Sequence, residues 1–163
     1  MPAVAALMNL AFRGVGAAAG WNSEAAYIDG DRTNPEMLRQ ELRDHPHGAF
    51  LVAEDGVGRI TGSVMLEPLY RNVWQLGSLA VDPAIQNSGT GRSLLAAAEQ
   101  WAQSAGAATI RMKVVNVRDT LIAWYVRRGY VVSVVTEPFP YGDDRFGTPR
   151  RPDLSFVVLE KRL

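Results

Sequence analysis

The sequence of 163 residues contains no cysteine and only two histidines, His45 and His47. The absence of cysteine excludes a disulfide scaffold, a thiol nucleophile and a cysteine-ligated metal. Two histidines are too few for a His-rich metal site. Because both follow a predicted helix end, where a histidine is favourable to the helix dipole, we interpret them as structural and expect no metal.

The sequence also lacks a charge excess and a long apolar run. Seventeen basic and seventeen acidic residues cancel, which argues against nucleic acid or an anionic membrane as a partner. No uncharged stretch approaches the ~20 apolar residues of a membrane-spanning helix, and no basic residue precedes the apolar start as in a signal peptide. We therefore expect a cytoplasmic protein and a single domain over residues 1–163, since domains usually have about 100–200 residues.

Hydrophobic periodicity and turn residues predict alternating helices and strands. Asn34 before Pro35 is a helix-capping pattern, Asp119 is a candidate cap of a later helix, and residues 55–58 are typical of a hairpin turn. Residues 21–31 receive no assignment. The predicted helices are 4–13, 35–44, 91–104 and 119–128, and the predicted strands are 49–54, 60–67, 74–82, 109–115, 130–136 and 155–159. This order favours a mixed sheet with one parallel crossover.

One loop has the composition of a phosphate site. Residues 86–92 read Gln-Asn-Ser-Gly-Thr-Gly-Arg and lie between a predicted strand and a predicted helix. Glycines there allow a tight turn with exposed N–H groups, and the helix N-terminus adds positive potential. Alternatively, the glycines only serve the turn. A P-loop would need Lys-Ser/Thr where the chain has Arg92-Ser93, and the dinucleotide fingerprint would need a glycine where it has Leu94.

A second cluster lies in the predicted helix 119–128. Leu121 and Tyr125 share one helix face because they are four residues apart. Taken alone, Tyr125 is a packing residue with its hydroxyl at the rim of the core.

Both motifs, in this order and separation, resemble the GNAT superfamily of N-acetyltransferases. The resemblance extends from about residue 50 to the C-terminus and depends on the strand at 76–83, Gln-x-x-Gly-x-Gly at 86–91 and Tyr-x-x-x-Gly-Tyr at 125–130. It implies the acyl-CoA N-acyltransferase fold, of α/β (α+β) class. In this fold helices cover both faces of a mixed, mostly antiparallel central sheet, and a parallel pair of strands splays apart at the cofactor site.

The chain departs from this family pattern at its start. The first strand of the family should precede the first helix, but here the helix begins almost at Pro2. That strand is therefore expected to be missing, either because it has been lost or because the sequence starts late. Its absence would leave the strand at 49–54 or its neighbour less covered, which favours a homodimer or reduced stability.

The resemblance also implies acetyl-CoA as co-substrate and assigns roles to residues. The loop would bind the pyrophosphate, the main chain of the preceding strand would pair with the pantetheine arm, and Tyr125 would protonate the leaving thiolate. Arg118 stands where family members often carry an asparagine, so Asn116 is the substitute candidate. The expected cofactor-binding residues are Leu79, Ala80, Val81, Gln86, Asn87, Ser88, Gly89, Thr90, Gly91, Arg92, Ser93 and Asn116.

Acetyl transfer to an amine needs a neutral amine, a polarised carbonyl and a proton for the departing thiolate. A tyrosine has an unperturbed pKa near 10, so Tyr125 would be protonated at pH 7 and can act as a general acid. A backbone N–H near Val81 could polarise the carbonyl. Glu67, at the end of the neighbouring strand, is the leading candidate for the general base. Glu24, Asp29, Asp143 and Asp144 are the others, although for each of them an ordinary solvated carboxylate is the simpler interpretation.

Two segments, 20–27 and 138–146, combine aromatic residues with carboxylates. The first contains a Gly-Trp-x-x-Glu stretch that resembles a bacterial subgroup of the superfamily. An aromatic and acidic lining would suit a small cationic amine. Alternatively, the aromatics and prolines only stiffen two long loops. The expected acceptor-binding residues are Trp21, Glu24, Tyr27, Phe139 and Tyr141.

The leading hypothesis is an N-acetyltransferase in which a small-molecule primary amine attacks acetyl-CoA directly in a ternary complex. The alternative is a non-catalytic CoA-binding module with a regulatory or partner-binding role. Acetylation of a protein or peptide N-terminus is a third reading. It would need an open groove where the two aromatic segments are expected to close a pocket.

Overall fold

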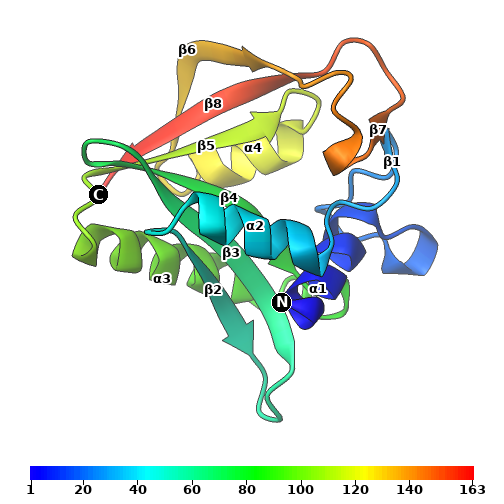
Figure 1. Cartoon of the computed structure of the whole chain (residues 1–163), viewed down its shortest axis with the longest axis horizontal. Helices are drawn as coiled ribbons and strands as arrows, with labels where there is room; N and C mark the ends of the chain where they lie inside the picture. The colour runs from blue at the N-terminus through cyan, green and yellow to red at the C-terminus, as the bar shows by residue number, and fades with distance from the viewer.

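A six-stranded sheet in the order β2-β3-β4-β5-β8-β6 forms the centre of the protein (Figure 1). The computed structural model describes residues 1–163, apart from the side chain of Phe146. The strands are β2 (Ala49–Glu54), β3 (Ile60–Tyr70), β4 (Val73–Val81), β5 (Thr109–Val115), β6 (Val131–Pro138) and β8 (Ser155–Arg162), and the helices are α1 (Pro2–Arg13), α2 (Pro35–Asp44), α3 (Thr90–Ser104) and α4 (Asp119–Val126).

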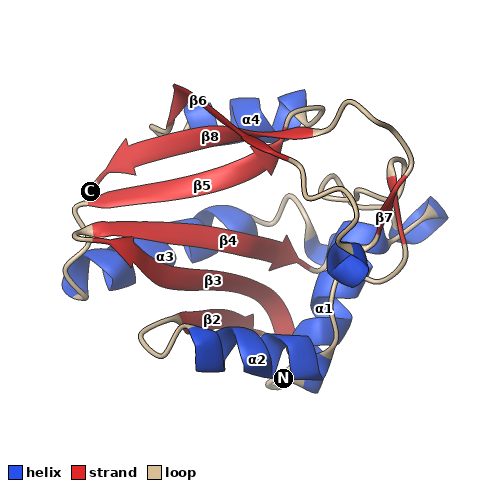
Figure 2. Cartoon of the chain, turned by 45° about the horizontal axis from the view of Figure 1, so that its top comes forward, coloured by secondary structure: helices blue, strands red, loops and turns tan.

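The sheet is antiparallel except between β4 and β5. These two strands pair in parallel only from Val73 to Gln75 on β4, opposite Thr109 to Arg111 on β5. Beyond Gln75 they diverge (Figure 2). The mixed, mostly antiparallel sheet with a splayed parallel pair is therefore confirmed.

Helices cover both faces of the sheet, as expected. Helices α1 and α2 lie on one face and α3 and α4 on the other (Figures 1 and 2). The apolar stripe of α3, which includes Leu94, Leu95 and Ala98, packs with residues of β3, β4 and β5 in the main core. On the opposite face α1 packs with Leu38 of α2 and Ala80 of β4 in a second cluster.

Local signals position most element ends. The Asn34 side chain accepts hydrogen bonds from the N–H groups of Glu36 and Met37, so the predicted cap of α2 is confirmed. The prediction that Asp119 caps α4 was wrong. Arg118 holds the cap position without a side-chain bond, and Asp119 lies in the first turn, where its charge still suits the helix dipole.

The chain before β2 contributes two α-helices and a short strand to the fold. Among the described residues, no strand of the six-stranded sheet precedes α1, and β2 is an edge strand. The segment that received no assignment contains β1 (Ile28–Asp29), which pairs with β7 (Thr148–Pro149). This two-stranded ribbon joins the two segments expected to flank the acceptor.

The opposite edge of the sheet is β6, whose valines are largely exposed. The homodimer stays a prediction. None of the helices described here has the length and apolar character needed to cross a membrane.

We expect the substitution Leu66→Ala to destabilise the fold strongly. Leu66 is fully buried on β3 between Ala49 and Leu76, so removing its side chain leaves a cavity at the centre of the sheet. The expected loss in the free energy of unfolding is about 2–5 kcal/mol, measured by urea denaturation. Leu69→Ala on the same strand is the control, because Leu69 is 40% exposed and surface changes stay within about 0.5 kcal/mol. Equal losses would contradict the packing described.

Candidate active site

A cavity of about 320 Å³ occupies the gap where β4 and β5 diverge. Its walls come from β4, β5, α1, α2, α4, the segment between α1 and β1, and the residues after β6. Four of the residues predicted from sequence line it together: Glu24, Leu79, Tyr125 and Phe139.

A β-bulge shapes β4 along this cavity. Ser63 of β3 pairs with Ala80 while Met65 pairs with Gly77, so two residues of β4 oppose Val64 alone. Ser78 lies in this bulge with a φ of +53°, a left-handed conformation that few non-glycine residues adopt. Bulges bend a strand and disrupt its ladder. This bulge lies where β4 has separated from β5.

The predicted phosphate loop connects β4 to α3. Asn87 and Gly89 have φ values of +71° and +88°, which turn the chain tightly into the helix. Within α3 the first intrahelical bond is from the N–H of Ser93 to the carbonyl of Gly89. The preceding N–H groups, from Thr90 to Arg92, therefore have no intrahelical acceptor and are suited to bind an anion.

The side chain of Gln86 has a different environment from the rest of this loop. Its Oε1 accepts a hydrogen bond from the N–H of Trp21 at 2.9 Å, and its Nε2 donates to the carbonyl of Val81 at 3.4 Å. Gln86 thereby connects the end of β4 to the segment between α1 and β1.

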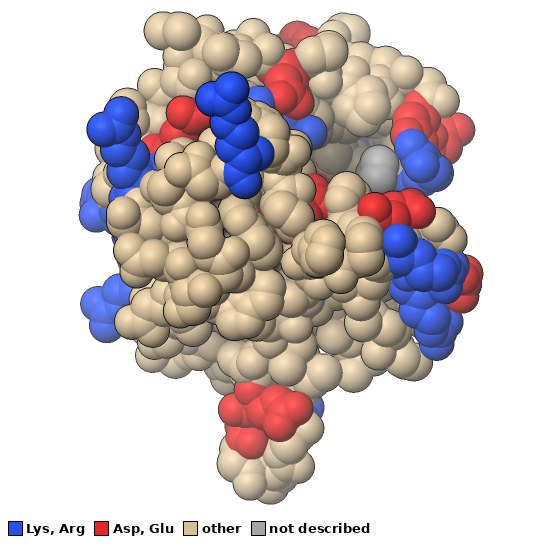
Figure 3. Space-filling model, turned by 60° about the vertical axis from the view of Figure 1, so that its left-hand side comes forward, with Lys and Arg blue, Asp and Glu red and all other residues tan. Residues whose placement is uncertain are grey.

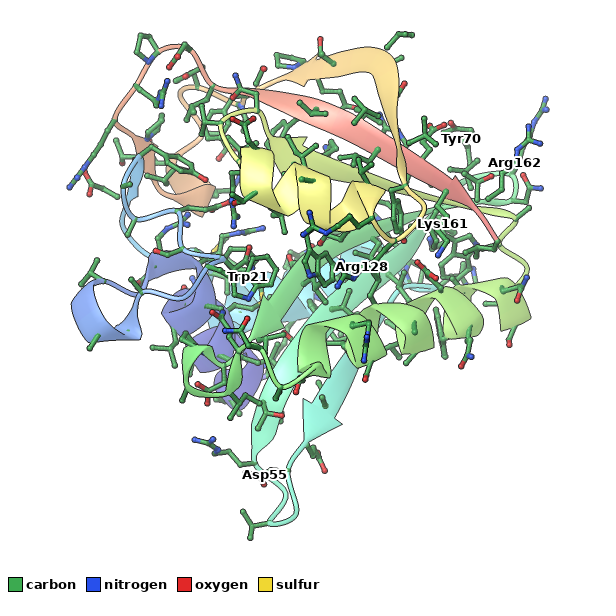
Figure 4. All side chains as sticks on the ribbon, turned by 180° about the vertical axis from the view of Figure 1, so that it is seen from behind. Trp21, Asp55, Tyr70, Arg128, Lys161 and Arg162 are labelled. Carbon is green, nitrogen blue, oxygen red and sulfur yellow. The ribbon has the colours of Figure 1, made fainter. Side chains whose placement is uncertain are left out.

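Two tryptophans and an arginine lie beside the loop. The Trp21 and Trp124 rings are 5.6 Å apart, and the Arg128 guanidinium lies 3.6 Å from the Trp124 ring centroid. Figure 4 shows Trp21 and Arg128 in the region between α4 and the start of α3. A Cβ added at Gly91 would lie 3.8 Å from Trp124, an ordinary van der Waals contact, so the Trp124 ring lies directly beside the loop.

A buried ion network holds the N-terminal wall of the cavity. Glu24 accepts from Nη1 of Arg13 at 2.8 Å and from Nη1 of Arg118 at 3.2 Å. The three side chains are at most 11% exposed. Arg118 also donates to Oδ1 of Asn22, and Asn22 donates to the carbonyl of Leu79. The network therefore joins α1, the segment between α1 and β1, α4 and β4.

Tyr125 projects from α4 into the cavity and is 5% exposed. Burial raises the pKa of the Tyr125 hydroxyl above its ordinary value, and the nearby charges of Arg118 and Arg128 only partly oppose this. The hydroxyl therefore stays protonated at neutral pH. The Trp124 and Tyr130 rings contact the Tyr125 ring edge-on at 5.0 and 5.6 Å and fix its position.

Two further carboxylates are Glu41, which lines the cavity, and Glu67, which pairs with Gln75 where β4 begins to leave β5. Glu41 of α2 lines the cavity, and burial followed by the negative charge of Glu67 raises the pKa of its carboxyl, against Arg32 and His45. Glu67 lies outside the lining. Its Oε1 accepts from Nε2 of Gln75 at 2.9 Å, and its Oε2 is 3.1 Å from Nδ1 of His45. Sequence reasoning missed Glu41 because an acidic residue on a charged helix carries no local signal.

Three other candidates lie outside the cavity lining. Asn116 donates to the carbonyl of Asp153 and accepts from the N–H of Ser155, so both ends of its amide bind the chain before β8. The hydroxyl of Tyr141 accepts a hydrogen bond from the N–H of Leu154, so Tyr141 also binds this part of the chain. Tyr27 packs beside Ile28, and burial raises the pKa of its hydroxyl.

The other carboxylates considered from sequence have different surroundings. Asp29 binds Arg150, and Asp143 binds Arg145, which lowers the pKa of the Asp143 carboxyl to about 2. The side chain of Phe146, the last residue of the second aromatic segment, lies outside the described part. No cluster of three or more metal-ligating side chains occurs in that part.

Charged side chains of both signs are interspersed on the face shown in Figure 3, with a wide uncharged area between them. This face therefore offers no extended basic surface of the kind that binds nucleic acid.

Comparisons with known proteins agree with this geometry. The profile of the Acetyltransferase (GNAT) family matches residues 15–130. The solved structure of ribosomal-protein-alanine N-acetyltransferase from Brucella melitensis is similar at a TM-score of 0.73 and 21% identity, over 99% of this chain and 93% of that one. A GNAT family acetyltransferase from Elizabethkingia anophelis, with acetyl-CoA bound, has a TM-score of 0.62 and 18% identity, over 80% and 84%.

A nourseothricin acetyltransferase is also similar, at a TM-score of 0.60 and 22% identity over 72% of this chain, and the match spans only 66% of that protein's length. At these identities the structural likenesses establish the fold. A search of curated proteins gives no match.

We expect Glu24→Gln to destabilise the protein, because it leaves the buried guanidinium groups of Arg13 and Arg118 without their shared carboxylate. Breaking a buried ion pair from one side costs about 3–5 kcal/mol, measured by urea denaturation. Glu36→Gln is a matched control, since Glu36 also binds two arginines but is 67% exposed and should change little. A loss no larger than that of the control would show that the network does not hold the cavity wall.

Proposed function

Because the chain belongs to the GNAT family of acetyltransferases, we propose that it transfers the acetyl group of acetyl-CoA to a primary amine of a small molecule. The observation that most directly supports this proposal is the position of Tyr125. This protonated hydroxyl lines a cavity that begins where β4 leaves β5, and the neighbouring Trp124 lies beside Gly91 of the predicted phosphate loop. Acetyl-CoA supplies the acetyl thioester that this arrangement would act on.

The residues present fit this co-substrate. The N–H groups at the start of α3, with the side chains of Ser88, Thr90, Arg92 and Ser93 nearby, offer donors for a pyrophosphate. Beyond Gln75 the edge of β4 that faced β5 no longer has a strand partner. The carbonyls of Leu79 and Val81 accept from Asn22 and Gln86, so the remaining main-chain groups of Leu79 to Val81 are those that can pair with an extended amide-containing arm. Arg128 adds a positive charge beside the loop.

In the proposed mechanism the neutral amine attacks the thioester carbonyl directly, while the Tyr125 hydroxyl donates its proton to the departing sulfur. A main-chain N–H at the end of β4 would polarise the carbonyl. No covalent intermediate with the protein is needed, which agrees with the absence of cysteine from the sequence.

The amine must lose a proton, and the structure offers two carboxylates for this step. Glu67, the base favoured by sequence, stays a candidate. Glu41 is better placed because it lines the cavity, whereas Glu67 lies behind Gln75. A raised pKa makes Glu41 a stronger base than an exposed glutamate. We assign proton acceptance to Glu41, directly or through water, and a positioning role to Glu67.

We expect Tyr125→Phe to lower kcat by about 10²-fold or more, because general acid catalysis contributes that much. The affinity for acetyl-CoA should be unchanged. Tyr130→Phe is the control. It removes a buried hydroxyl that donates to Glu99, and its ring centroid is 5.6 Å from that of Tyr125, but Tyr130 does not line the cavity. Because the pKa of Tyr125 lies above its ordinary value of 10.0, wild-type kcat should not decline with rising pH up to about pH 10.

The measurement is release of CoA thiol with a panel of primary amines, beside thermal unfolding with acetyl-CoA. A ligand at 100 times its Kd stabilises the native state by about 2.7 kcal/mol. Acetyl-CoA binding without turnover of any amine would favour the non-catalytic CoA-binding module. Unchanged kcat in Tyr125→Phe would remove the general-acid role.

At pH 7 we expect the kcat of Glu41→Gln to be about 10-fold or more below the kcat of Glu67→Gln. The reason is that losing a general base lowers kcat by about 10²–10⁴-fold, whereas losing a positioning residue lowers it less. Raising the pH should rescue Glu41→Gln as the free amine population increases. The kcat profiles of both variants from pH 6 to 9 decide between them. The reverse order of effects would return the base assignment to Glu67.

A further inference from the structure

The two histidines of the chain have different surroundings. His45 is the C-cap residue of α2, and its side chain is 43% exposed and lies against Glu67 of β3. His47 follows two residues later and is exposed. Sequence analysis interpreted both histidines as structural because they follow a helix end. The contacts of His45 indicate a further role for that residue alone.

Glu67 presents a buried oxygen to His45. The Glu67 side chain is only 12% exposed, and its Oε1 accepts a hydrogen bond from Nε2 of Gln75. Its Oε2 is buried, has no hydrogen bond within the described part of the chain, and lies 3.1 Å from Nδ1 of His45. A buried polar atom without a partner costs free energy. A proton on Nδ1 of His45 would supply the donor that this oxygen lacks.

This contact determines which ring nitrogen of His45 is free. A neutral imidazole has one N–H and one nitrogen with a lone pair. With the N–H on Nδ1 and directed toward Glu67, the lone pair is on Nε2. A carboxylate that orients a histidine in this way stabilises the imidazolium that forms when the other nitrogen takes a proton.

Glu41, the proton acceptor proposed above, lies one helical turn before His45. The N–H of His45 donates to the carbonyl of Glu41 at 3.0 Å, so the turn between them is complete. Side chains four residues apart on a helix are neighbours, with about 5–6 Å between their Cβ atoms. Burial raises the pKa of the Glu41 carboxyl and Glu67 raises it further, against Arg32 and His45, so these charged groups lie near it.

The proposed reaction yields a proton that has to leave the site. An amine that enters as an ammonium has three protons on its nitrogen, and the amide product has one. Of the two protons lost, one restores the Tyr125 hydroxyl after this group has protonated the thiolate. The other is released to solvent. Glu41 lines the cavity that the acceptor would fill, so it needs a route by which to lose this proton before the next turnover.

We propose that His45 is a proton relay: its Nε2 takes a proton from the Glu41 carboxyl, directly or through one water, and releases it to solvent, while Glu67 holds the ring through Nδ1. This inference rests on the proposed acetyl transfer. After each transfer Glu41 is again a carboxylate and His45 is again neutral, so only O–H and N–H bonds change. The positioning role of Glu67 is thereby exerted on His45.

The first experiment identifies the neutral form of His45 by nitrogen-15 NMR at about pH 9, above the range in which histidine usually takes up a proton. Because the chain has only two histidines, the spectrum of His47→Asn assigns both. We expect His45 to have its proton on Nδ1 in the wild type and to lose this preference in Glu67→Ala, while His47 does not change. A neutral His45 with its proton on Nε2 in the wild type overturns the relay.

The second experiment compares thiol release by His45→Asn and the wild type. The asparagine amide can donate to Glu67 in place of Nδ1 but has no counterpart of Nε2. We expect kcat to fall about 10-fold, less than for loss of the general base itself. The KM for acetyl-CoA and the free energy of unfolding should stay close to wild type, and free imidazole should restore kcat. His47→Asn is the matched control, with unchanged kcat and no response to imidazole.

The outcomes separate the two proposals. Unchanged kcat in His45→Asn, or a loss that imidazole does not restore, overturns the relay while acetyl transfer stands. His45→Gln takes its place if His45→Asn does not fold, and the NMR measurement on the wild type needs neither variant. Failure of the wild type to release thiol with any primary amine overturns the proposed function, and the relay with it.

Discussion

The carboxylate of Glu24 is the constraint on which the site depends, because it binds two arginines that are far apart in the sequence. Arg13 ends α1 and Arg118 precedes α4, so their shared partner fixes the segment between α1 and β1 against both. Asn22 in that segment extends the connection to the carbonyl of Leu79 on β4. This network therefore connects α1, α4 and β4 across the cavity.

The sheet supplies the complementary constraint. The parallel pairing of β4 and β5 ends after three residues, and the bulge at Ser78 lies in the part of β4 that has left β5. The apolar clusters on both faces of the sheet hold the two strands although their ladder is short. The cavity in the opening between these strands is lined by residues of β4 on one side and by Tyr125 of α4 on the other.

The features that sequence could predict are local. The capping Asn34, the glycines at the start of α3 and the spacing of Leu121 and Tyr125 act over a few residues, and the elements they predict are present. The charge of the cavity could not be predicted, because Glu24 meets its partner Arg118 across 94 residues. The ribbon of β1 and β7 was also missed, since strands of two residues have no hydrophobic period.

The contacts of Gln86 couple two surfaces that are far apart in the sequence. One amide side chain joins the carbonyl of Val81, in the strand before the predicted phosphate loop, to the N–H of Trp21, the residue immediately before Asn22. A ligand that displaces this amide at the loop would alter the Trp21 segment, and a ligand that displaces Trp21 would alter the loop. Because such coupling is reciprocal, each of the two ligands would change the affinity for the other by the same factor.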